Sequence, residues 1–104
     1  MSGDSISDDE VDVLYRQMID SFIDRANRFA EQNSPENVGM ALLFAASRFN
    51  SFVVSQHAEN LEGYQFDIAK AKTFFTAQYA QMLDENLEDY KLAFDKYAKF
   101  VKNH

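Results

Sequence analysis

The chain has 104 residues, no cysteine, one proline and three glycines, which is material for one domain with few long loops. Its 17 acidic residues outnumber its 10 basic ones and give a formal net charge of -7, which disfavours binding to the phosphate backbone of nucleic acids. The absence of cysteine excludes disulfides, thiolate catalysis and thiolate metal sites.

The N-terminal part of the sequence predicts a short tail followed by an amphipathic helix. Residues 1–6 are mostly small and polar, and we expect a disordered tail ahead of one helical domain over 7–104. Ser7 is placed to cap a helix, because Glu10 three residues later can complete a capping box. Apolar residues then recur three and four positions apart, so the first helix is predicted to end near Gln32. No secretory signal pattern precedes it, which predicts a cytoplasmic protein.

The second predicted helix is the most apolar element. Ser34 and Pro35 form a strong start signal, since serine caps helices and proline fits the first helical position. The apolar residues do not keep to one face, so this helix is expected to be central and covered on several sides. The residues predicted to be inaccessible are Leu42, Ala45, Ala46, Phe49 and Val53. With Arg48 near its middle, the stretch is expected to be a core helix and not a membrane span.

The third predicted helix follows a connection over 58–63 and carries apolar residues at helical spacing to the end of the chain. A single helix over 64–104 would approach 60 Å, which is long for a domain of this size. We therefore expect a break or bend near residues 84–86, with a fourth helix behind it. The predicted fold is all-α: a small bundle of three long helices, the third broken in this way.

Four segments of the sequence carry a family resemblance: 22–27 (FIDRAN), 41–53 (ALLFAASRFNSFV), 75–79 (FTAQY) and 86–90 (NLEDY). Together they resemble a small family of uncharacterised proteobacterial helical proteins, catalogued as a domain of unknown function, over roughly residues 14–94. The resemblance implies a bacterial, helical, cytoplasmic protein and no particular chemistry. Arg25 occupies a position where an apolar residue is expected.

Arg48 is the strongest candidate for a polar site. A guanidinium on the most apolar helix needs a carboxylate or carbonyl partner to offset its desolvation. In an antiparallel hairpin, Asp20 lies at the level of Arg48, Asp24 lies one turn away, and Asn50 adds a neutral polar group. One interpretation is a structural ion pair, and the other is a pocket that binds a small ligand or anion.

Other polar residues favour structural roles. His57 near the end of the second helix suits the negative end of the helix dipole, and it lacks the further ligands of a metal site. The acidic runs at 8–12 and 84–89 are typical of solvated helix starts, not of a paired-carboxylate active site. We therefore expect no enzyme activity, no cofactor and no bound metal.

The C-terminal segment reverses the charge of the chain. Residues 90–104 contain four lysines and one aspartate, and their apolar residues fall on one arc of a helix. Docking of this helix onto the protein or a second copy is favoured over a membrane surface, because the rest of the chain is acidic. The leading functional hypothesis is a non-enzymatic interaction module that associates with itself, for example as a homodimer, or with another protein. The alternative is the ligand or anion site near Arg48.

Overall fold

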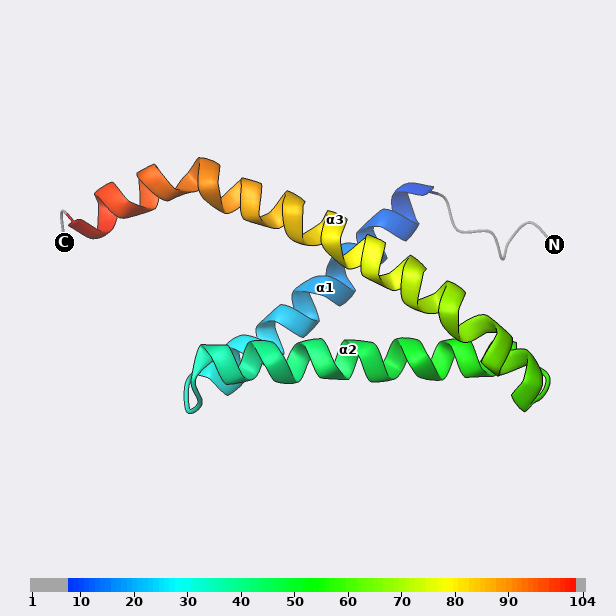
Figure 1. Cartoon of the computed structure of the whole chain (residues 1–104). Helices are drawn as coiled ribbons and strands as arrows, with labels where there is room; N and C mark the ends of the chain where they lie inside the picture. Colours follow the sequence, from blue (N-terminus) through cyan, green and yellow to red (C-terminus); the bar gives the residue numbers. More distant parts are fainter. Residues whose placement is uncertain (1–7, 103–104) are drawn as a thin grey trace. The chain divides into compact units, whose positions relative to one another are not determined.

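Residues 8–102, the part of the backbone that the structure describes, form three helices: α1 (Asp8–Ala30), α2 (Pro35–His57) and α3 (Leu61–Lys102) (Figure 1). The structure, a computed structural model, describes the backbone of residues 8–102 and side chains as far as Phe94. No strand occurs within this part of the chain, so the all-α prediction is confirmed. The predicted tail and the Ser7 cap lie outside the described residues. The chain divides into two compact units, Met1–Ser51 and Phe52–His104, and the single domain stays a prediction.

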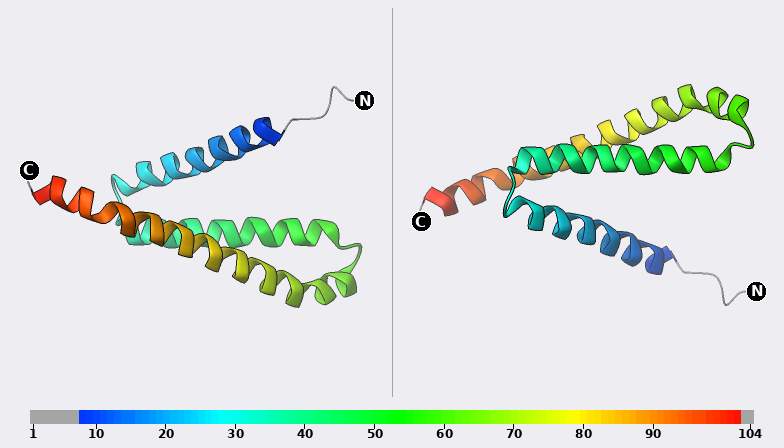
Figure 2. Two further views of the ribbon diagram at one scale, coloured as in Figure 1. Left: turned by 90° about the horizontal axis from the view of Figure 1, so that it is seen from above. Right: turned by 90° about the horizontal axis from the view of Figure 1, so that it is seen from below.

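The first unit is a helical hairpin formed by α1 and the larger part of α2, and its two helices diverge from the connecting turn (Figure 2). The side-chain amide of Asn33 donates to the carbonyl of Phe29, at 2.8 Å, where α1 ends. The Ser34 hydroxyl accepts from the backbone N–H of Asn37, at 3.1 Å, and Pro35 is the first residue of α2. The predicted start of this helix is confirmed.

The second unit contains the end of α2 and the whole of α3. Asn60 caps α3, because its side-chain oxygen accepts from the backbone N–H of Gly63 at 2.8 Å. Gly63 therefore lies in the first turn of α3. The prediction that the connection extends through Gly63 is wrong for this reason, and the connection is only residues 58–60.

The predicted break near residues 84–86 is wrong, because α3 is one continuous helix of 42 residues. Asn86 does not cap a new helix: its side-chain amide donates to the carbonyl of Met82, at 2.9 Å, one turn earlier in the same helix. Asp and Asn cost only a few tenths of a kcal/mol in a helix interior, whereas Pro or Gly would cost about 1 to 3 kcal/mol. Neither Pro nor Gly occurs after Gly63.

The predicted inaccessible set on α2 is also wrong for the single chain. Leu42 is 38% exposed, Phe49 is 65% exposed, and Val53 is half-buried. Ala45 and Ala46 are exposed as well. The physical reason in the first unit is that α1 meets one side of α2 while the apolar residues of α2 lie on several sides.

Candidate functional site

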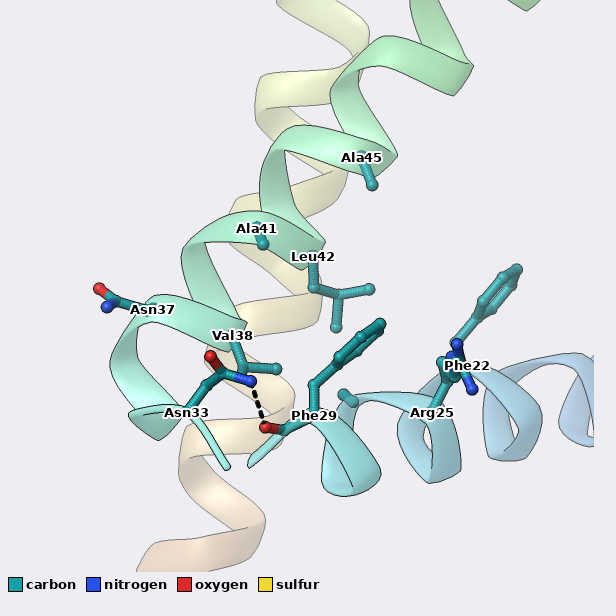
Figure 3. A pocket seen from close by; sticks show the side chains of 10 residues that line it. Phe22, Arg25, Phe29, Asn33, Asn37, Val38, Ala41, Leu42 and Ala45 are labelled. Carbon is teal, nitrogen blue, oxygen red and sulfur yellow. Dashed lines mark hydrogen bonds between the residues drawn. The ribbon is translucent and has the colours of Figure 1, made fainter. Parts of the chain in front are cut away.

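A pocket of about 570 Å³ lies in the first unit, between α1 and α2 near the turn that joins them (Figure 3). Its volume is in the range of small-molecule sites in proteins. Phe29, Val38 and Leu42 gather close to the turn, and Phe22 lies further along α1 (Figure 3). The complete lining is Phe22, Arg25, Ala26, Phe29, Asn33, Asn37, Val38, Ala41, Leu42 and Ala45.

The spacing of residues along the two helices explains why a pocket forms here. On α2 the lining residues recur three and four positions apart, and two of them, Ala41 and Ala45, have short side chains. On α1 the large rings of Phe22 and Phe29 stand on either side of the small Ala26. Since the helices diverge, these alanines leave space that the neighbouring rings do not fill. The result is an apolar cavity whose width is set by small residues.

Arg25 gives the pocket its single charged group. The guanidinium of Arg25 lies over the ring of Phe29, 4.8 Å from the ring centroid, which is within the range of a cation–π contact. Asn33 and Asn37 add neutral polar groups at the end next to the turn. An apolar cavity with one guanidinium suits a ligand with an apolar body and one anionic group.

The four residues predicted for a polar site do not line this pocket. Asp24 pairs with Arg28 on its own helix, with Arg28 Nε 3.2 Å from Asp24 Oδ2, and both side chains are exposed. Arg48 and Asp20 are exposed, and Asn50 is half-buried. No ion pair or hydrogen bond joins Arg48 to Asp20 or Asp24 among residues 8–94. The Arg48 side chain is therefore exposed in the single chain and needs no partner to offset a loss of hydration.

Sequence reasoning missed Arg25 as a candidate site residue. The available signal was its place in the first helix, between Phe22 and Phe29, where an apolar residue is expected. The aliphatic stem of an arginine at such a position can extend across the apolar surface and carry the charged end to solvent. Otherwise the guanidinium lies within the apolar surface and provides a polar group there. Nothing in the spacing of residues showed that α1 and α2 diverge, so the cavity beside Arg25 could not be predicted.

A family model described as "Protein of unknown function (DUF3144)" matches residues 15–91 of the chain. The match covers well over half of the sequence. The chain belongs to this family. Neither the curated proteins nor the solved structures that were searched contain a match. The resemblance to an uncharacterised domain family is therefore confirmed, and membership carries no activity with it.

Among the described residues of this DUF3144 protein, no group of three or more His, Cys, Asp or Glu side chains could hold a metal ion. His57 is the last residue of α2. The acidic residues Asp8, Asp9 and Glu10 form the first turn of α1, where carboxylates oppose the positive end of the helix dipole. The run at 84–89 lies instead inside α3, away from either end of that helix.

The apolar character of α2 also meets the length and composition test for a membrane-crossing helix. An 18-residue window in Pro35–His57 has a mean hydropathy of 1.4, and none of it is buried. A core helix of a soluble protein passes the same test, so this is weak evidence by itself. Arg48, close to the middle of α2, would cost a few kcal/mol at the centre of a bilayer.

Proposed function

We propose that this chain is a non-enzymatic helical interaction module that works as an assembly of identical copies. The observation that carries the proposal is that none of the described residues is buried, including the large apolar ones. Phe44 is 67% exposed and Tyr90 is 72% exposed. Folded domains are stabilised by removing such side chains from water, so these surfaces need a cover.

The helix lengths lead to the same conclusion. At about 1.5 Å per residue, the 42 residues of α3 span roughly 63 Å, and the 23 residues of α1 or α2 span roughly 34 Å. Whatever their arrangement, neither shorter helix can cover the whole length of α3. A second copy of the chain can supply a helix for the part of α3 that one shorter helix leaves open.

The charge of α2 favours a second copy as the partner. This helix contains one acidic and one basic residue, Glu36 and Arg48, apart from the terminal His57. Two copies can therefore bring their α2 surfaces together without strong repulsion between like charges, although each chain has a net charge of -7.

The test is the mass of the protein in solution together with its melting temperature as a function of concentration. We expect sedimentation equilibrium to give a dimer or larger assembly at micromolar concentration. Because unfolding then separates the copies, the melting temperature is expected to rise by several degrees between about 1 and 100 μM protein. A monomer with the same melting temperature across this range would overturn the proposal.

A second candidate function is binding of an apolar anion in the hairpin pocket, and the observation in its favour is Arg25 among the apolar lining residues. The candidate ligand site is therefore the hairpin pocket beside Arg25, which has a cavity, and not the region near Arg48. We expect decanoate to raise the melting temperature of the protein and decanol, which lacks the charge, to raise it much less.

The matched variants are Arg25→Gln and Arg48→Gln, which remove one guanidinium each from the same hairpin. If decanoate binds in the pocket, Arg25→Gln abolishes the difference between the melting-temperature increases caused by decanoate and by decanol. Arg48→Gln retains that difference. An equal response of both variants and the parent would show that the pocket does not recognise the anion.

A further inference from the structure

A stripe of apolar residues runs along the later half of α3 and is open. This heptad stripe consists of Ala80, Leu83, Leu87, Tyr90 and Phe94, which are alternately three and four residues apart. Helices in coiled coils pack along stripes with this spacing. We propose that the heptad stripes of two copies of the chain pack together in antiparallel orientation, with the two-fold axis level with the midpoint between Leu87 and Tyr90. The inference rests on the proposed function and names the surface through which the copies associate.

The heptad stripe is separate from the side of α3 that is half-buried within one chain. The half-buried residues between positions 64 and 78 are Tyr64, Asp67, Ala71, Phe75 and Gln78. On a helix with 3.6 residues per turn, these residues and the heptad stripe each occupy an arc of about 80°, and the centres of the two arcs are about 140° apart. Leu83 is 40% exposed, and Leu87, Tyr90 and Phe94 are each at least 60% exposed. Folding of one chain therefore leaves the heptad stripe open to a partner.

In the antiparallel register, the large side chains of the heptad stripe meet in mixed layers. Leu87 of one copy packs beside Tyr90 of the second copy, and Leu83 packs beside Phe94 of the second copy. Because of the two-fold axis, each of these layers occurs twice. Every layer joins an aliphatic side chain to an aromatic ring, so two rings never compete for one position.

The charges next to the heptad stripe are complementary in this register. Asp84 and Lys91 lie on the same side of the stripe, about 60° to 80° from its centre. Within residues 8–94, Asp84 has no ion-pair partner, and Lys91 has a weak one, with its Nζ 4.0 Å from Glu88 Oε1. An antiparallel pair brings these sides of the two copies together. Asp84 of one copy is then offset from Lys91 of the other by about two residues, or roughly 3 Å along the axis, which a lysine side chain spans. This contact also occurs twice.

A parallel pair lacks these ion pairs. In parallel coiled coils opposite sides of the stripe adjoin, so Asp84 lies beside Tyr79 of the second copy and Lys91 lies beside Asn86. Neither of these two neighbours carries a charge at neutral pH. The parallel arrangement also sets the four acids of residues 84–89 at the same level in both copies, which is unfavourable. The antiparallel orientation is favoured on both grounds.

The charge of the segment also disfavours an anionic membrane as the cover of the heptad stripe. Residues 80–94 contain four acids and one lysine, and a negatively charged surface repels such a segment. A contact between identical copies needs no basic partner, because the two-fold axis brings the acid on each chain to the base on the other. A second copy is therefore the partner that the charges next to the stripe favour.

Reversal of single charges in the full chain tests this contact. We expect Asp84→Lys and Lys91→Glu each to weaken self-association about fivefold or more, because both ion pairs of the dimer become like-charge contacts. The double variant Asp84→Lys/Lys91→Glu restores both pairs and is expected to associate within about twofold of the parent. An equal mixture of the two single variants is expected to form heterodimers. Sedimentation equilibrium measures the association, and circular dichroism checks that each variant is helical.

Glu85→Lys is the matched control for Asp84→Lys, because it changes the net charge equally on the side of α3 opposite the heptad stripe. It is expected to leave association unchanged, and a loss equal to that of Asp84→Lys would overturn the contact. Single variants that remain as strongly associated as the parent, or a double variant that is not restored, would overturn this interface and leave the proposed assembly standing. A monomeric parent protein would overturn both.

Discussion

A chain that ends at Asn86 is expected to be monomeric and to melt at least about 10 °C lower than the full chain. The deletion removes Leu87, Tyr90 and Phe94, whose exposed side chains form the open surface of α3. Full burial of one such side chain stabilises a protein by about 1.5 to 3 kcal/mol, and a two-fold interface uses each of them twice. Sedimentation and thermal unfolding of the two chains at equal concentration measure both effects.

A full-length variant, Tyr90→Gln/Phe94→Gln, is the matched control for this deletion. It keeps the length and charge of α3 and changes only the apolar surface, so it should reproduce most of the loss. Unchanged stability of the shortened chain would contradict the docking of this segment on a second copy. A shortened chain that keeps its stability and loses binding to anionic vesicles would point to the membrane.

Much of the local structure could be predicted because it depends on residues close in sequence. Ser34 and Pro35 mark the start of α2, and the structure contains the predicted cap. The same kind of reasoning did not locate the start of α3, where Asn60 caps the helix and Gly63 is tolerated in its first turn. Asn60, followed by Leu61 and Glu62, was a usable signal for a helix start. The glycine at position 63 suggested a loop instead.

The break in α3 was predicted from the size of a typical domain, and the capping residues Asp84 and Asn86 decided where it was placed. Asp84 and Asn86 can cap a helix, but a cap requires the backbone to leave the helix first. Without proline or glycine, the helix continues, and Asn86 bonds back to Met82. The expected compact dimension of a single domain is a weaker constraint than the local preference of these residues for a helix.

The site was harder to predict than the helices, because it depends on the distance between them. Arg48 was predicted to form a polar site because α2 was expected to be central and buried, but in the single chain Arg48 is exposed. The pocket depends on the divergence of α1 from α2 and on the short side chains of Ala26, Ala41 and Ala45. Residue spacing shows which face of a helix is apolar, but it does not show whether two such faces meet closely.

The second large effect is expected from Leu42→Asp, which should unfold much of the chain at room temperature. Leu42 is 38% exposed and faces Phe29 in the hairpin pocket (Figure 3). A carboxylate there loses much of its hydration and finds apolar lining residues around it, at an expected cost of about 3 kcal/mol or more. Denaturant unfolding followed by circular dichroism measures the change in the free energy of unfolding.

Met40→Asp is the matched control, because it introduces the same residue into the same helix two positions earlier. Met40 is 65% exposed and does not line the pocket, so the hairpin alone predicts a loss limited to the lower helix propensity of aspartate, a few tenths of a kcal/mol. A larger loss that appears only at concentrations where the protein associates would place Met40 in the contact between copies. Equal tolerance of both substitutions would contradict the packing of α1 against this side of α2.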